Sequence, residues 1–220
     1  MLSRPLHHPD EADLVGYANG STTGASALFI ATHLAYCPAC RGAVATAEAV
    51  AGTLMDEEAL AGGSDGSALP DVTGVLQEQV GATTSAQRAG AAWSVPEPLR
   101  SAVGIAPAAV PWQNIWFGVK EYPIPGFEPA ARLLWIPASR RMPRHDHDGV
   151  EWTMVVTGDF SDSTGRYGVG DVQIGVPGLN HQPKAGPGGP CICLVVTEAR
   201  LNFSGLLGTV LNWGRTPAAR

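Results

Sequence analysis

The sequence predicts a protein of two parts, a helical N-terminal part followed by an all-β antiparallel sandwich or barrel. Its 220 residues are 45% hydrophobic and 15% charged, which provides enough apolar side chains for two small cores or one large core. Apolar residues recur at helical spacing in the first half, whereas the second half has short alternating runs separated by Gly and Pro. All six tryptophans lie at or after Trp93, a change in composition that marks a domain boundary.

The composition also excludes several classes of protein. A net charge of −6 and a pI near 5.4 argue against a basic face that grips nucleic acid. No apolar run approaches the roughly 18 residues of a membrane span, and residues 1–13 lack the apolar core of a signal peptide. Four cysteines in two close pairs do not form the disulfide framework of a secreted protein. We therefore expect a soluble cytoplasmic protein.

Four helices are predicted between residues 1 and 92. Asp10 is placed to cap the first helix, which Asn19-Gly20 then stops. Pro38 fits the first turn of the third helix. The expected helices cover residues 10–17, from 21 or 23 past 34, 38–54 and 68–88.

Five strands are predicted in the second half, each bounded by Gly or Pro. They are Ile115–Val119, Arg132–Ile136, Glu151–Val156, Asp171–Val176 and Cys191–Thr197. Four prolines within residues 94–111 indicate a linker. We therefore divide the chain into a helical domain at 1–92, a linker at 93–111, a barrel domain at 112–205 and a C-terminal tail at 206–220.

The spacing His33-x3-Cys37-x2-Cys40 predicts a metal site at the turn between the second and third helices. Two thiolates and an imidazole suit Zn²⁺, and a closed structural site needs a fourth ligand, for which His7 and His8 are available in this domain. The alternatives are a redox-active pair or two buried cysteines, but the nearby histidine favours metal. Such a site would stabilise short helices that have mostly Ala and Val cores.

A second group of potential ligands lies in the barrel domain. His145 and His147 are two residues apart, so their side chains share one face of an extended strand. Glu151 follows four residues later, and His181 lies near a turn further along. Three imidazoles and a carboxylate suit Zn, Mn, Fe or Ni, and the residue types alone do not choose among them. The alternative is a set of surface histidines, although most histidines of the chain fall into these two patterns.

Cys191 and Cys193 share one face of the last predicted strand, with Cα atoms about 6.5–7 Å apart, which is long for a disulfide. We interpret them as small buried residues, with a possible redox role left open. If the barrel domain senses an oxidant, its metal ligands, Trp135 and Trp152 are equal candidates.

The motif His145-x-His147-x3-Glu151-x6-Gly, followed by Gly-Asp-x5-Pro-Gly-x2-His181, resembles the two motifs of the cupins. Cupins are jelly-roll-like antiparallel barrels with a metal inside. Ser139 stands where the first motif usually opens with Gly, and Ala185 where the second often closes with Asn. Together with the helical His-x3-Cys-x2-Cys domain, nearly the whole chain resembles the ChrR-type zinc-binding anti-sigma factors of bacteria.

This resemblance implies two zinc ions per chain. The N-terminal zinc would be held by His8, His33, Cys37 and Cys40, and the cupin zinc by His145, His147, Glu151 and His181. It also implies a regulator and not an enzyme. The helical domain would bind an extracytoplasmic-function-type sigma factor and keep it from RNA polymerase and promoter DNA. The cupin-like domain would be needed for release when singlet oxygen or a related oxidant appears.

The charge of the helical domain agrees with such a partner. Residues 1–92 contain ten acidic residues and three arginines, a net charge of −7 that suits the basic, DNA-facing surfaces of a sigma factor. An acidic face can also serve solubility alone. Two other hypotheses keep the same architecture: a metal-dependent cupin enzyme, such as a dioxygenase or isomerase, with a helical appendage, and a sensor whose cupin cavity binds a small molecule.

Overall fold

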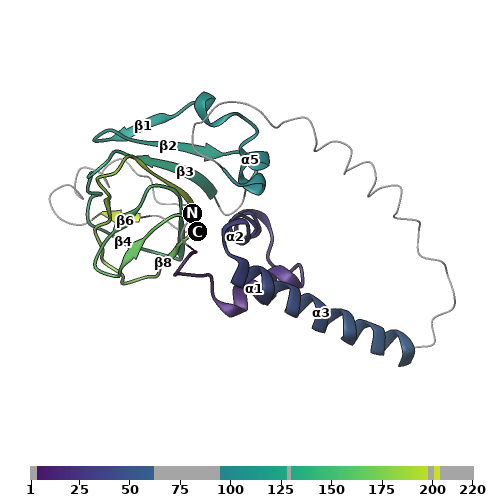
Figure 1. Cartoon of the computed structure of the whole chain (residues 1–220). Helices are drawn as coiled ribbons and strands as arrows, with labels where there is room; N and C mark the ends of the chain where they lie inside the picture. Colours follow the sequence, from purple (N-terminus) through teal and green to yellow (C-terminus); the bar gives the residue numbers. More distant parts are fainter. Residues whose placement is uncertain (1–3, 62–94, 128–129, 198–200, 204–220) are drawn as a thin grey trace, which may run out of the picture.

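The structure is a computed structural model that describes residues 4–61, 95–127, 130–197 and 201–203 (Figure 1). It has N-terminal helices followed by an antiparallel β domain, which confirms the predicted fold class. The fourth predicted helix, at 68–88, and the C-terminal tail lie outside the described residues.

The N-terminal helices are α1 (Glu11–Ala18), α2 (Gly24–Tyr36) and α3 (Pro38–Ala61). Asp10 occupies the N-cap position of α1, but its side chain makes no capping hydrogen bond. The third helix continues beyond the predicted end at residue 54, because the residues that follow include strong helix formers. Within the described part of the chain, no helix combines the length and the apolar character needed to cross a bilayer.

The β domain consists of three antiparallel sheets. The six-stranded sheet has the order β1-β2-β3-β10-β5-β8, and smaller sheets have the orders β7-β6-β9 and β11-β4. The strands are β1 (Gln113–Trp116), β2 (Val119–Ile124), β3 (Ala130–Ile136), β4 (His145–His147), β5 (Glu151–Thr157), β6 (Phe160–Ser161), β7 (Arg166–Tyr167), β8 (Val172–Gly175), β9 (Lys184–Ala185), β10 (Cys191–Thr197) and β11 (Leu201–Phe203). Four of the five predicted strands correspond to β3, β5, β8 and β10.

The predicted strand Ile115–Val119 is wrong, because a hairpin turn divides it into the end of β1 and the start of β2. Phe117 and Gly118 both have positive φ angles, of 48° and 80°, and Trp116 pairs with Val119 across the turn. Two successive left-handed residues make the turn that matches the twist of a hairpin. Because residues 115–119 are apolar throughout, alternation of apolar and polar residues could not reveal the turn. Gly118 was the one local signal of a turn.

The segment predicted as a linker contains part of the core. Helix α5 (Glu97–Val103) begins with Pro98 in its first turn and ends at Gly104, whose φ is 69°. Leu99 is fully buried and Val103 nearly so, and both contact the core cluster that includes α2 and the large sheet. The prolines therefore start a helix here, as a proline in the first turn can, and do not merely separate two domains.

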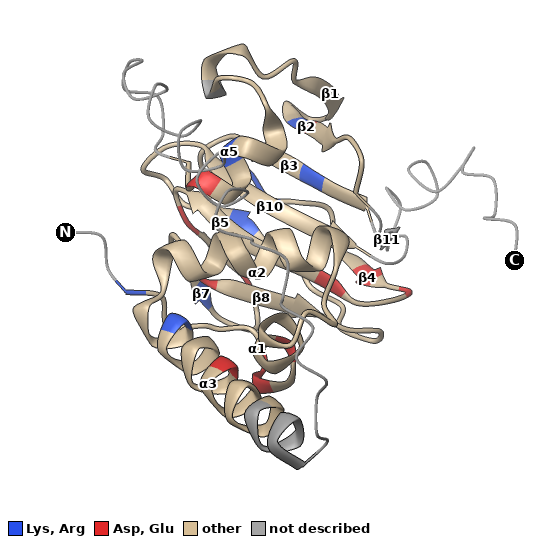
Figure 2. Ribbon diagram, turned by 90° about the vertical axis from the view of Figure 1, so that its right-hand side faces the viewer, with Lys and Arg blue, Asp and Glu red and all other residues tan. Residues whose placement is uncertain are grey.

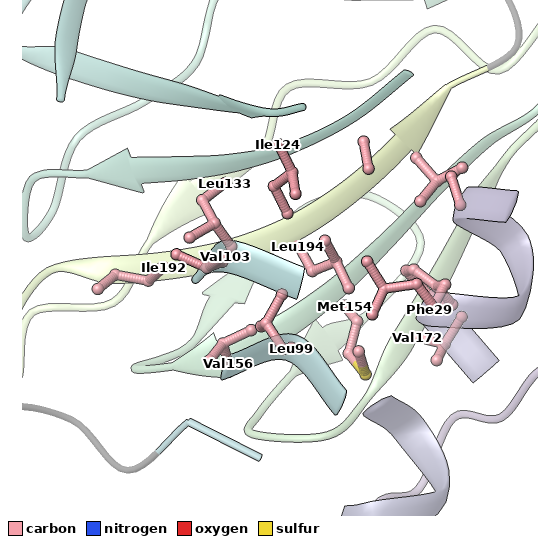
Figure 3. Close-up of a cluster of buried hydrophobic side chains, with 14 of the residues drawn as sticks. Phe29, Leu99, Val103, Ile124, Leu133, Met154, Val156, Val172, Ile192 and Leu194 are labelled. Carbon is pink, nitrogen blue, oxygen red and sulfur yellow. The ribbon is translucent and has the colours of Figure 1, made fainter. Parts of the chain in front are cut away.

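Helix α2 packs on one face of the six-stranded sheet, so that the two halves of the chain share a core (Figure 3). Phe29 is fully buried, and its ring centroid lies 5.3 Å from that of Trp152 on β5. Strand β10 is buried on both faces. Its side chains at 192, 194 and 196 face this shared core, while those at 191, 193 and 195 belong to a second cluster inside the barrel.

Replacing Leu99 with alanine tests whether α5 belongs to the core. We expect Leu99→Ala to lower the free energy of unfolding by about 2–5 kcal/mol, because it leaves a cavity among fully buried side chains. The control is Leu54→Ala on α3, where the side chain is 60% exposed and the expected change is below about 0.5 kcal/mol. Urea unfolding followed by circular dichroism measures both. Equally small effects would mean that residues 97–103 act only as a linker.

Candidate metal sites

The first group of potential ligands lies where α2 meets α3. His33 is near the end of α2, Cys37 lies between the helices, Cys40 is in the first turn of α3, and His8 comes from the segment before α1. His8 Nδ1 lies 3.4 Å from both sulfurs, and His33 Nε2 lies 3.3 Å from Cys40 Sγ. All four ligand atoms are within 4.8 Å of one another. The structure therefore brings together the four residues expected for the N-terminal zinc.

The protonation of this group favours a bound cation. His33 Nδ1–H donates to the carbonyl oxygen of Gly170 at 2.9 Å, which leaves Nε2 without a proton and directed at Cys40. Burial lowers the pKa of His33 to about 4, and burial beside Cys37 raises the pKa of Cys40 to about 12. A metal ion would supply the positive charge that converts such thiols into thiolate ligands. Two sulfurs and two imidazoles form a donor set that fits Zn²⁺.

The residue types left His7 and His8 open as the fourth ligand, the family resemblance implied His8, and the structure separates the two. His8 joins the group of four, whereas His7 Nδ1 lies 3.5 Å from the Asp171 carboxylate. The His7 ring also packs on Tyr167, with ring centroids 4.6 Å apart. The two neighbours thus face different parts of the protein.

The second group lies inside the β domain. His145 and His147 on β4 share a buried face, as their spacing predicts, and His181 is joined to His145 by an isolated β-bridge. His181 Nε2 lies 3.0 Å from the Nε2 atoms of both other histidines. The site needs a glycine at position 175 on β8, because a Cβ atom there would lie 2.7 Å from His147 Nε2.

The hydrogen bonds around these histidines direct unprotonated nitrogens toward one another. His145 Nδ1–H donates to the carbonyl oxygen of Pro143 at 2.9 Å, and His181 Nδ1–H donates to Asp162 at 2.7 Å. Both rings therefore present Nε2 to the space between them, where the two atoms lie 3.0 Å apart, and a cation bound there would be a ligand partner for both. Burial, together with the other histidines, lowers the pKa of His145 to about 4. The donor set fits a divalent transition metal.

Glu151 lies apart from the three histidines. Its carboxylate accepts a hydrogen bond from Arg132 at 3.2 Å and lies 3.5 Å from the Thr153 hydroxyl. Burial raises its pKa although Arg132 lowers it. Glu151 lines the same cavity as His145 and His181, but its oxygens are not in the group of converging ligand atoms. Its role as a fourth ligand stays a prediction.

Sequence reasoning missed Asp162, which holds one of the histidines in place. Its buried Oδ2 accepts from His181 Nδ1 and, at 2.8 Å, from Gln173 on β8, while Oδ1 accepts from the backbone and hydroxyl of Thr164. Burial raises the pKa of Asp162, but these hydrogen bonds outweigh it and hold the pKa at about 2. The sequence around it, Asp-x-Thr-Gly, signals only a turn.

Cys191 and Cys193 lie side by side and buried on β10, as predicted, with sulfurs 3.6 Å apart. The contact with Cys191 and burial raise the pKa of Cys193 well above its usual value, so the thiol form prevails. Cys193 also lines the cavity beside His145. Of the two candidate tryptophans, Trp135 carries Lys120 Nζ 4.8 Å above its ring, and Trp152 contacts α2. A redox role for any of these stays a prediction.

The fold and the two ligand groups define a cupin-like protein that has a helical His/Cys domain at its N-terminus. The sequence model of the family described as "ChrR Cupin-like domain" matches residues 100–200. The anti-sigma-E factor ChrR of Cereibacter sphaeroides is 41% identical over 202 residues, which cover 91% of this chain and 93% of that protein. The chain belongs to the ChrR family of anti-sigma factors.

A solved structure gives the same result. The crystal structure of Rhodobacter sphaeroides SigE in complex with the anti-sigma ChrR matches with a TM-score of 0.67 and 38% identity, covering 87% of this chain and 98% of that chain. The predicted resemblance is thus confirmed. Because the relative of 41% identity is an anti-sigma factor, the alternative of a cupin enzyme with a helical appendage is not supported.

Metal analysis tests the two ligand groups separately. We expect two metal ions per chain, one of which is lost in Cys37→Ser/Cys40→Ser and the other in His145→Ala/His181→Ala. Inductively coupled plasma mass spectrometry of protein purified without chelators measures both. The control Cys191→Ser/Cys193→Ser should keep two metal ions. Metal content that is unchanged in either ligand variant would contradict the corresponding site.

Replacing Asp162 tests its effect on His181. Asp162→Asn removes the charged acceptor that fixes the orientation of the imidazole, so we expect the affinity of the cupin site for metal to fall about 10–100-fold. Competition with a chromophoric chelator measures this affinity. Asp159→Asn, which breaks only a surface ion pair with Arg166, should leave it unchanged. Equal affinities in the two variants would show that Asp162 does not act on the site.

Proposed function

We propose that this protein is an anti-sigma factor that sequesters an extracytoplasmic-function-type sigma factor through its helical domain. The observation that carries the proposal is the 41% identity to an anti-sigma factor along nearly the whole chain, together with the complete set of four converging His and Cys residues. A relative of 38% identity has been crystallised with its sigma factor, SigE. A sigma factor acts in the cytoplasm, so we place the protein there.

The composition of the helical domain suits a basic protein partner. By sequence, helices α1 to α3 contain six acidic residues and one basic residue, Arg41. Figure 2 shows acidic positions on α1 and α3. The second half of α3 projects from the rest of the protein (Figure 1), with exposed side chains at Val50 (56%), Leu54 (60%) and Met55 (71%). Exposed apolar side chains can supply contact area, and the net negative charge of these helices can supply electrostatic steering.

Zinc is the metal we propose for the N-terminal group. Four ligands of the Cys2His2 type form a closed tetrahedral site, which is typical of structural zinc and leaves no open position for chemistry. The metal would hold the segment around His8 against the junction of α2 and α3. Zinc is also our proposal for the cupin group, with Glu151 as the fourth ligand if Arg132 releases it.

We infer that the cupin domain is needed for release of the sigma factor when singlet oxygen or a related oxidant appears. The support is chemical: one cavity is lined by two metal-binding histidines, Glu151 and the thiol of Cys193. Each of these groups, like Trp135 and Trp152, is a candidate for oxidation. A small molecule bound in this cavity is the other signal compatible with the geometry.

Binding measurements test the anti-sigma role. We expect the purified full chain to bind an extracytoplasmic-function-type sigma factor of its own organism and to block transcription by the corresponding RNA polymerase. Cys37→Ser/Cys40→Ser should abolish binding, because loss of the metal unfolds the helical domain. His145→Ala/His181→Ala should retain binding but not oxidant-induced release. Normal binding by the cysteine variant, or no binding of any such sigma factor by the wild type, would contradict the proposal.

A further inference from the structure

The N-terminal metal group takes its outer contacts from the cupin domain. The turn Gly168–Asp171 lies between β7 and β8 and contacts the residues around both His33 and His8. The carbonyl oxygen of Gly170 accepts the Nδ1 proton of His33, 137 residues away in sequence. This hydrogen bond fixes the tautomer and the ring orientation of a proposed ligand.

Asp171 makes the corresponding contact with the N-terminal segment that carries His8. Its buried Oδ1 accepts the backbone N–H groups of Leu6 at 2.5 Å and His7 at 2.9 Å. The N–H of Val172 donates to the carbonyl oxygen of His7 at 3.2 Å. The chain immediately before His8 is therefore held on β8, and a carboxylate acceptor makes these hydrogen bonds stronger than neutral ones.

Closing the turn requires only one of the two carboxylate oxygens of Asp171. Oδ2 of Asp171 accepts the N–H of Gly168 at 2.7 Å, which closes the turn in the ordinary way. Oδ1 accepts the hydrogen bonds of Leu6 and His7, which are 164 or more residues away in the sequence. The same carboxylate thus shapes the turn that presents the Gly170 carbonyl and holds the segment that carries His8.

We propose that Asp171 is a positioning residue of the N-terminal metal site, and that the turn Gly168–Asp171 makes the cupin domain part of that site. The inference rests on the proposed function only in that the His/Cys group binds metal. Outer contacts of this kind commonly account for 10–100-fold in metal affinity. The cupin domain would therefore control how tightly the sigma-binding domain keeps its metal.

The same strand reaches the second metal group. Gln173 on β8, two residues beyond Asp171, donates to Asp162, which accepts the proton of His181. The start of β8 therefore contributes outer contacts to both sites.

Cobalt substitution provides a readout that belongs to the N-terminal site. Thiolate-to-cobalt charge-transfer bands arise only where cysteine is a ligand, and the converging ligand atoms of the cupin group include no cysteine sulfur. We expect Asp171→Asn in the full chain to raise the dissociation constant of the cobalt–thiolate site about 10–100-fold and to speed cobalt loss to EDTA. The amide would place an N–H₂ group opposite the Gly168 or His7 N–H and would remove the charge. The matched control Asp159→Asn should behave as wild type.

A second pair of variants tests the docking without changing a charge. A Cβ atom at Gly170 would lie 2.7 Å from Pro5 and 2.8 Å from Tyr36, so Gly170→Ala wedges the turn away from α2 and the N-terminal segment. Gly126 has a similar φ, 82° against 87°, but nothing lies within 4 Å of its Cβ position. We expect Gly170→Ala, and not Gly126→Ala, to weaken cobalt retention.

The outcomes separate this inference from the proposed function. A wild-type chain without thiolate–cobalt bands would overturn the metal site itself. Bands in the wild type, with unchanged retention in Asp171→Asn or Gly170→Ala, would overturn the role of the turn. Should both variants fail to fold, hydrogen exchange of the metal-loaded wild type decides: slow exchange of the Leu6 and His7 amides supports the inference, and unprotected amides contradict it.

Discussion

Orientation of imidazole rings by hydrogen bonds is the constraint on which both candidate metal sites of this protein depend. His145 and His181 direct their Nε2 atoms at each other across 3.0 Å because their other nitrogens are held as donors. In the N-terminal group, the Gly170 carbonyl holds His33 Nδ1 so that Nε2 faces Cys40, whose thiol pKa burial raises. In both groups the surrounding protein thus orients imidazoles toward the other potential ligands, which is how outer contacts prepare a site for a divalent ion.

The two halves of the chain are joined by packing as well as by hydrogen bonds. Phe29 of α2 lies in the core of the large sheet, and Leu99 of the supposed linker completes that core. The turn Gly168–Asp171 then joins the sheet to the His/Cys group. For an anti-sigma factor this arrangement is informative, because residues at and just before the start of β8 contact both the N-terminal His/Cys segment and Asp162, the partner of His181.

Most of the fold could be predicted because its signals are local. Cap and stop residues, Pro38 and helical periodicity identified α1 to α3, and alternation identified four central strands. The turn at Phe117-Gly118 and the short strands β4, β6, β7 and β9 have two or three residues each, too few for periodicity. Helix α5 was missed for another reason, because the proline at position 98 was interpreted as part of a linker. Only the structure shows that Pro98 begins a helix, whose residues Leu99 and Val103 are buried in the shared core.

In the candidate sites, too, local features could be predicted from the sequence and long-range contacts could not. The residue types and spacings of His33-x3-Cys37-x2-Cys40 were sufficient to predict a converging group, because a helix end, a one-residue connection and a new helix fix those positions locally. The residue types left His7 and His8 open, the family resemblance implied His8, and the structure places His8 in the group. The outer contacts from Asp171 and Asp162 were decided by the tertiary structure alone. These contacts join residues that are brought together by tertiary packing and not by the local backbone. No local sequence pattern therefore predicts them.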